Sequence, residues 1–216
     1  MITGNFLELC QLTLAKAQFS GTGPGSVLNQ TGEAKQVVES VQAAWLAIQD
    51  EENHWAFLSD EQQSLTVIGR KNYMPADLNA PELKGIDKLF CEQTPLTYLS
   101  PAEFKDRFRF GTEQGQPRYV TQDLIGGISK IVLYPIPDKA YNLHLEYKKK
   151  PQFFINNEDI PNIDLRHRWA IVYLAALDLA QQQEDGGLHQ QMTQKYAEAL
   201  QNMHSQYLPT WDFAHL

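Results

Sequence analysis

The chain has 216 residues, of which 43% are hydrophobic and 20% are charged. This balance is typical of one globular domain or of two small lobes that share a core. No run approaches the roughly 18 apolar residues of a membrane helix, and the first residues lack the basic region of a secretory signal, so we expect no membrane association and no secretion. The formal net charge of −8 argues against a protein that binds DNA by neutralising phosphates. It fits a solvated acidic surface, or a surface that lets DNA slide past without sticking.

The first third of the chain predicts two helices. The first covers residues 5–19 and is followed by a glycine-rich loop over residues 20–26. Thr31 is placed to cap the second helix, which we expect to fade through Trp55 and Phe57. Its apolar residues recur at helical spacing and form one stripe: Val37, Val38, Val41, Ala44, Trp45 and Ile48.

From about residue 62 the pattern changes to that of strands. Candidate strands contain β-branched or aromatic residues near turn residues: 64–69, 73–75, 96–99, 115–121 and 131–134. In the last candidate, Leu143, Leu145 and Tyr147 alternate with His144 and Glu146, so the first three are expected to face inward. Because residues 138–140 form a short connection, we expect the last two strands to pair as an antiparallel hairpin. Residues 101–108 predict a short helix with proline in its first turn.

The helical period returns near residue 165. One helix carries a second apolar stripe: Leu165, Trp169, Val172, Tyr173, Ala176, Leu177 and Ala180. Gly186 and Gly187 interrupt it, and a last helix runs to Pro209. We expect Trp45 and Trp169 to be core anchors, each buried against the other's helix.

These elements predict an α+β fold, a discontinuous helical bundle with an inserted small antiparallel β-sheet lobe. The expected parts are N-terminal bundle helices over residues 1–60, a β-rich lobe over 61–161, C-terminal bundle helices over 162–208, and an aromatic tail over 209–216. Because Trp211 and Phe213 would lie on one side of an extended tail, we expect them to enter a pocket together with Leu208 and Leu216. That pocket lies on a partner or neighbouring subunit, or on the chain's own bundle.

The sequence lacks common motifs of catalysis, nucleotide binding and metal binding. There is no phosphate-binding glycine loop, no GxSxG elbow and no HExxH helix. The two cysteines, Cys10 and Cys91, lack the spacing of a zinc site and are expected to be reduced thiols. Two acid-x-x-His pairs occur, Glu51/His54 and Asp164/His167. A di-iron bundle needs further inward carboxylates, so the sequence predicts no catalytic, cofactor or metal site and no enzyme.

Three small basic groups stand out, around residues 105–109, 148–150 and 166–168. Exposed charges of this kind usually contribute little beyond solubility. The alternative is that one of the groups contacts an acidic neighbour or touches DNA.

Four segments in order resemble one family, the head–tail connector adaptors of tailed bacteriophages. They are Asn29–Phe57, Gly115–Arg118, Leu133–Pro151 and Asn157–Ala176. Asn162 and Ile163 depart from the pattern at a position where a second proline is expected, and residues 124–127 look like a small insertion.

The resemblance implies a structural subunit of the phage neck, present in the virion between capsid and tail and assembled in the host cytoplasm. Its partners would be identical subunits in a dodecameric ring, the portal protein, a downstream tail or neck protein, and genomic DNA passing without specific contact. Two alternatives stay open. One is a neighbouring neck role, as a stopper or tail-completion protein; the other is a cellular DNA-binding regulator, which the acidic charge disfavours.

Overall fold

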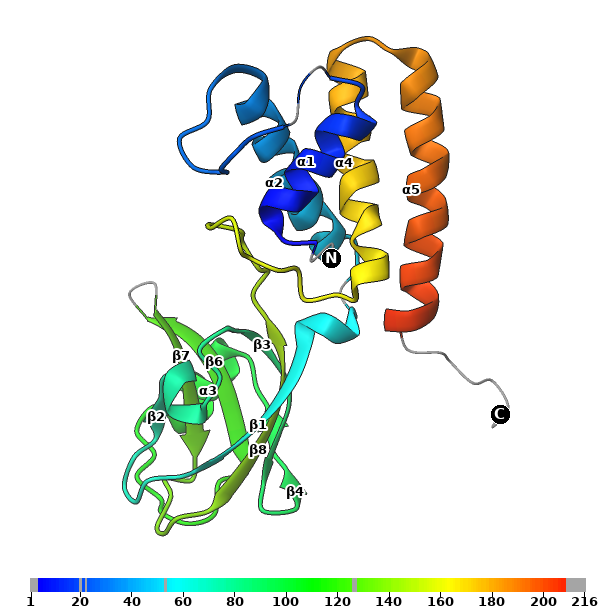
Figure 1. The fold of residues 1–216 in the computed structure, drawn as a ribbon. Coiled ribbons are helices and arrows are strands. Elements are labelled where there is room, and N and C mark those ends of the chain that lie inside the picture. The colour runs from blue at the N-terminus through cyan, green and yellow to red at the C-terminus, as the bar shows by residue number, and fades with distance from the viewer. Residues whose placement is uncertain (1–3, 20, 22, 53, 126–127, 209–216) are drawn as a thin grey trace, which may run out of the picture. The chain divides into compact units, whose positions relative to one another are not determined.

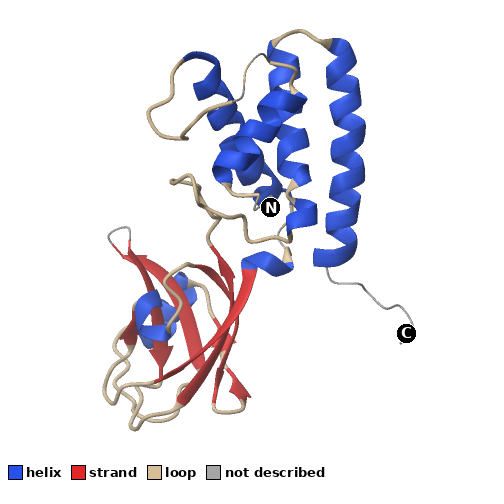
Figure 2. Cartoon of the chain, viewed as in Figure 1, coloured by secondary structure: helices blue, strands red, loops and turns tan. Residues whose placement is uncertain are grey.

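The computed structural model describes residues 4–19, 21, 23–52, 54–125 and 128–208. The chain divides into two compact units, one formed by Met1–Phe57 with Pro151–Leu216 and the other by Leu58–Lys150. Figure 2 shows that the first unit is helical and that the strands belong to the second. The predicted α+β class is confirmed.

The helical unit is built from four long helices and two 3-10 turns (Figure 1). Their bounds are α1 Phe6–Lys16, α2 Gly32–Glu51, η1 Ala56–Leu58, η3 Leu165–His167, α4 Trp169–Gln182 and α5 Gly186–Tyr207. Helix α4 is central, because it packs against α1, α2 and α5. Thr31 occupies the N-cap position of α2 as expected, although its side chain makes no capping hydrogen bond. The second helix ends at Glu51, and only a 3-10 turn follows near Phe57.

The core of this unit is organised around Trp45, whose side chain has no exposed surface. Its ring stacks on Phe57 and on Phe154, with centroids 5.8 and 5.9 Å away. The backbone N–H groups of Gln152 and Phe154 donate to the side-chain oxygens of Gln49 and Gln42, at 2.7 and 3.1 Å. These contacts explain why residues 151–161, which the sequence analysis assigned to the β-rich lobe, belong to the helical unit.

Helix α4 buries only part of the stripe that the sequence predicted, namely Val172, Ala176 and Ala180. Leu165 is 48% exposed and Trp169, Tyr173 and Leu177 are only partly buried. The residues of α4 that are buried are Ala170, Ile171, Val172, Ala175, Ala176, Leu179 and Ala180. Trp169 is therefore not the buried anchor that we expected. Because α4 is apolar on almost all sides, periodicity alone could not select the face that meets α1 and α2.

The second unit, here called the β unit, contains two four-stranded sheets with the orders β1-β8-β3-β4 and β2-β7-β6-β5. The strands are β1 Ser59–Leu65, β2 Asn72–Tyr73, β3 Leu83–Cys91, β4 Thr94–Pro95, β5 Thr97–Tyr98, β6 Tyr119–Ile125, β7 Ile128–Tyr134 and β8 Asn142–Lys149. A 3-10 turn, η2 Pro75–Leu78, and a short helix, α3 Pro101–Phe108, complete the unit. All pairs are antiparallel except β5 with β6.

The two sheets enclose a continuous apolar core. In β8, Leu143, Leu145 and Tyr147 are at most 3% exposed, which confirms the predicted alternation. Leu83 and Leu89 of β3 and Ile131 and Leu133 of β7 join the same cluster. The inward faces of the two sheets are therefore buried against each other, whereas several large apolar side chains outside this core are exposed: Leu65, Val67, Ile68, Tyr98, Phe110 and Leu124.

The predicted hairpin of the last two strands is wrong. β7 pairs with β2 and β6, whereas β8 pairs with β1 and β3, so the link over residues 135–141 crosses from one sheet to the other. The carbonyls of Pro137 and Ile136 accept from the N–H groups of Gly69 and Gly115. Pro135 and Pro137 have no N–H to donate to a ladder, which makes this link a connection between sheets rather than a turn.

The predicted strand over residues 64–69 is also largely wrong. The strand β1 ends at Leu65, and Val67 and Ile68 lie in an exposed turn closed by a hydrogen bond from Arg70 N–H to the Val67 carbonyl. The short helix α3 is confirmed, and Ser100 and Glu103 form a capping box at its start.

Candidate docking surface of the helical unit

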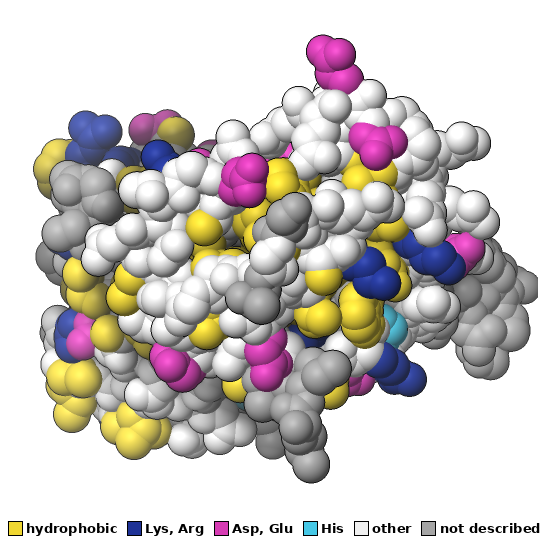
Figure 3. All heavy atoms as spheres, turned by 45° about the horizontal axis from the view of Figure 1, so that its top comes forward, with side chains coloured by type: hydrophobic (Ala, Val, Ile, Leu, Met, Phe, Trp, Pro, Cys, Tyr) yellow, Lys and Arg dark blue, Asp and Glu magenta, His cyan; other side chains and the backbone are white. Residues whose placement is uncertain are grey.

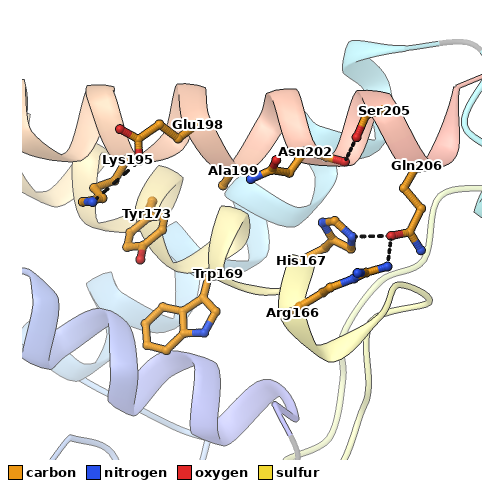
Figure 4. A pocket seen from close by; sticks show the side chains of 10 residues that line it. All are labelled: Arg166, His167, Trp169, Tyr173, Lys195, Glu198, Ala199, Asn202, Ser205 and Gln206. Atoms are coloured by element: carbon orange, nitrogen blue, oxygen red, sulfur yellow. Dashed lines mark hydrogen bonds and ion pairs between the residues drawn. The ribbon is translucent and has the colours of Figure 1, made fainter.

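A groove of about 500 Å³ runs along the helical unit between α4 and α5. On one side it is lined by Arg166, His167, Trp169 and Tyr173, from η3 and α4. On the other side it is lined by Lys195, Glu198, Ala199, Asn202, Ser205 and Gln206, all from α5. Figure 4 shows these side chains projecting from η3, α4 and α5.

One end of the groove is held by a small polar network. Gln206 Nε2 donates to Asp164 Oδ2 at 2.7 Å, and its Oε1 lies 2.7 Å from His167 Nε2 and accepts from Arg166. The Tyr207 hydroxyl accepts from the backbone N–H of Asp164 at 2.9 Å. These bonds tie the end of α5 to η3, so the groove has a fixed wall at this end.

Residues of the two acid-x-x-His pairs form hydrogen bonds with neighbouring protein side chains, as expected of structural residues. His167 is buried and faces Gln206 and the ring of Tyr207. Glu51 accepts a hydrogen bond from the Tyr196 hydroxyl at 2.8 Å. Burial, reinforced by this bond, raises the pKa of Tyr196. Among the described residues no group of three or more His, Cys, Asp or Glu is arranged to hold a metal ion.

Trp169 joins the groove to a second hollow of about 110 Å³ between α1 and α4. The hollow is mostly apolar and includes Leu9, Leu12 and Val172. Trp169 stacks on Tyr173 with centroids 5.7 Å apart, and the Lys16 ammonium lies 5.6 Å from its ring centroid. We call the groove and the hollow together, with Trp169 between them, the open face.

The open face gathers nearly all the positive charge of its unit. The helical unit has 14 acidic and only five basic residues, Lys or Arg, a net charge of −9. Four of those five border the open face: Lys16, Arg166, Arg168 and Lys195. Figure 3 shows basic side chains beside exposed hydrophobic ones on the side of the molecule that it presents. An aromatic surface with a basic rim can bind an apolar, acidic partner.

Three residues of the other predicted basic groups, Lys105, Lys148 and Lys149, are ion-paired within the β unit. Lys105 lies 2.6 Å from Asp123, and Lys148 lies 3.4 Å from Asp87. The β unit has 12 acidic and 13 basic residues, a net charge of +1. Lys105 and Lys148 therefore have acidic partners within their own unit.

Of the residues predicted to dock on a partner, only Leu208 is described, and it is partly buried just after α5. Trp211, Phe213 and Leu216 lie outside the described residues. The open face itself was missed. Its signal in the sequence is the repeat of large apolar residues four apart, Leu165, Trp169 and Tyr173, on a helix that is apolar on its other sides as well.

Both cysteines are buried and unpaired, as expected. Burial raises the pKa of Cys10 to about 12 and that of Cys91 to about 11. Thiols with such pKa values are unreactive near neutral pH, since the thiolate is the nucleophile.

A family model described as SU10 adaptor protein matches residues 14–211. A search of the curated proteins finds no match. None of the described helices combines the length and hydropathy required to cross a membrane.

Proposed function

Because the chain belongs to the SU10 adaptor protein family, a family of phage head–tail adaptors, we propose that it is a ring-forming subunit of the phage neck. In this proposal the ring docks on the portal protein, extends the DNA channel and provides the platform to which the tail attaches. A member of this family is a structural component of the phage particle, and the proposal assigns it a place between capsid and tail.

The family match carries the proposal. It extends over residues 14–211 and therefore includes the β unit and almost all of the helical unit. Because the match covers both units, the function of the family is proposed for the chain as a whole and not for one unit alone.

The charge distribution supports passage of DNA without binding. A net charge of −9 on the helical unit repels a polyanion, and in the β unit Lys105 and Lys148 are paired with carboxylates. Strong duplex binding depends on many basic side chains that are free to neutralise phosphates. The protein is thus suited to a channel through which DNA moves.

For the contact with the portal we propose the C-terminal tail, with Leu208, Trp211, Phe213 and Leu216 as anchors. The tail follows α5 directly, and Pro209 prevents α5 from continuing into it. Large aromatic residues that enter a pocket are frequent hot spots of binding.

Reconstitution with the purified portal protein of the same phage tests the proposal. The expected result is co-sedimentation of the two proteins and, in electron micrographs, an added ring beneath the portal. Absence of co-sedimentation at several ratios and salt concentrations would contradict the neck assignment. Retention on immobilised duplex DNA that salt abolishes would favour a DNA-binding role instead.

A further inference from the structure

The helical unit exposes a second apolar feature away from the open face. In the loop that leads from Pro151 to η3, Phe153, Ile155 and Ile160 are 61%, 67% and 48% exposed. Phe154, between the first two, is buried against Phe6 with ring centroids 4.8 Å apart. We call residues 153–160 the apolar loop.

The apolar loop is held in one shape by hydrogen bonds on both of its sides. Asp159 Oδ2 accepts from the N–H groups of Ile155 and Asn156, the latter at 2.8 Å. Asn157 Oδ1 accepts from the Val27 N–H at 2.8 Å, and the Asp159 carbonyl accepts from the Phe6 N–H at 2.8 Å. A segment that is already ordered loses little entropy when it binds, so its exposed apolar side chains are suited to docking.

The apolar loop and the groove lie on different sides of the same unit. In Figure 1 the tip of the loop projects beneath α1 and α2, whereas α5, one wall of the groove, lies on the far side of α4. A chain that has a projection on one side and a recess on another can join its copies head to tail, and such a contact closes into a ring when the rotation fits.

The charges of the two features are complementary. The apolar loop carries Glu158, which is exposed, and Asp159, and residues 151–165 contain no Lys or Arg. The groove presents Arg166 and Lys195 near the aromatic rings of Trp169 and Tyr173. Each of the two lies 3.6 Å from a carboxylate of its own unit, Asp164 and Glu198 respectively, in an exposed ion pair. Exposed ion pairs of this kind contribute little and exchange readily, so in a unit with a net charge of −9 Arg166 and Lys195 remain able to contact the acidic apolar loop of another copy.

We propose that the apolar loop of one copy docks in the groove of the next, with Phe153 and Ile155 placed against Trp169 and Tyr173. This contact rests on the proposed function, since it supplies the subunit interface of the proposed ring. It also accounts for the partial exposure of Trp169 and Tyr173 on α4, because a helix that is apolar on almost all sides is normally covered on all of them. Duplex DNA is the weaker occupant of the groove, because the acidic remainder of the unit repels it.

Cysteine cross-linking tests this contact without disturbing the core. The variant Ile155→Cys/Ala199→Cys places one thiol on the apolar loop and one in the groove. Cys10 and Cys91 are buried and contribute no background. The variant is treated with a short thiol-specific bifunctional reagent, both bound to the portal and as a concentrated solution of the protein alone. The controls are the two single variants and Ile68→Cys/Ala199→Cys, since Ile68 is as exposed as Ile155 but lies in the β unit.

A head-to-tail contact gives a ladder of covalent oligomers from the double variant, one heterodimer from a mixture of the two single variants, and no ladder from the Ile68 control. A product that stops at the dimer indicates a two-fold contact and overturns the inference. Absence of cross-links in both samples, or a ladder of equal strength from the control, also overturns it. Portal binding without a ladder supports the neck assignment and refutes the contact between copies. A ladder without portal binding supports that contact and contradicts the neck assignment.

A charge placed on the apolar loop gives a second test. Ile155→Asp should lower the yield of rings on the portal about tenfold or more, as expected for loss of an interface anchor. The matched Ile68→Asp should leave that yield within about twofold, and both variants should keep the melting temperature of the parent because both sites are exposed. An unchanged yield for Ile155→Asp refutes the contact. If the protein instead binds duplex DNA and Trp169→Ala abolishes that binding, the groove is a DNA-binding site and the proposed contact between copies is refuted.

Discussion

The two units treat their apolar surface differently. In the β unit, two sheets close over a shared core that includes Leu89, Ile131 and Leu145, and acidic and basic residues nearly balance. The helical unit has a core around Trp45, yet it leaves Trp169 and Tyr173 of α4 partly exposed and gathers its few basic residues beside them. In the β unit the exposed apolar side chains, such as Phe110 and Leu124, lie outside this closed core. In the helical unit they line a groove, and we propose that contact with another copy covers it.

The largest loss of stability is expected from a substitution at Trp45, in the core of the helical unit. Trp45→Ala should lower the free energy of unfolding by about 3–5 kcal/mol, because it removes a fully buried indole that stacks on Phe57 and Phe154. Chemical denaturation followed by circular dichroism measures this loss. A loss below about 1 kcal/mol would show that the core of the helical unit lies elsewhere.

The core of the β unit is tested at Leu145. Leu145→Ala should cost about 2–5 kcal/mol, since the side chain is 1% exposed within the two-sheet core. Glu146→Ala, one position along the same strand, is the control. Its ion pair with Lys88, 3.7 Å apart at the surface, contributes about 0–1 kcal/mol. Equal losses for the two variants would contradict the inward and outward assignment of β8.

Trp169 should behave unlike Trp45 although both are tryptophans on helices of one unit. Trp169→Ala should cost only about 1 kcal/mol in the isolated protein, because the ring is partly exposed and no closed cavity is left behind. Urea denaturation of the two variants measures the loss in free energy of unfolding for each, so the two losses can be compared directly. A loss for Trp169→Ala as large as that for Trp45→Ala would mean that Trp169 supports the core and not a docking surface.

The smallest expected effect on stability is that of removing the tail. Deletion of residues 209–216 should leave the melting temperature nearly unchanged and should abolish recruitment to the portal. Thermal scanning and co-sedimentation measure the two quantities on the same preparation. A truncated chain that unfolds indicates a tail packed on its own bundle, and one that still binds the portal refutes the tail as anchor.

The sequence predicted elements best where the signal is local. Ser100, Pro101 and Glu103 mark the start of α3, and Gly186 and Gly187, which begin α5, directly follow the break after Gln182. The α+β class and the alternation in β8 follow from periodicity alone.

The predictions that failed concern features that depend on contacts between segments far apart in the sequence. The strand β3 was missed because Asp87 and Lys88 interrupt its apolar pattern, and its register shifts where Gly85 and Lys88 meet β8. The hairpin prediction failed because β7 and β8 do not pair with each other: β7 pairs with β2 and β6, whereas β8 pairs with β1 and β3 in the other sheet. The face of α4 was assigned only partly correctly, because Ala170, Ile171 and Ala175 are as apolar as the stripe that was chosen. For the candidate site, the sequence drew attention to the basic residues 166–168 but not to the groove, because α5 approaches α4 only in the folded unit.

The central claim is that the open face of the helical unit is covered when the protein assembles. An electron cryo-microscopy reconstruction of the protein bound to the portal tests it most directly. We predict a ring in which the apolar loop of each subunit, with Phe153 and Ile155, lies in the groove formed by α4 and α5 of the next subunit. A ring in which Trp169 and Tyr173 remain open to solvent would contradict the account.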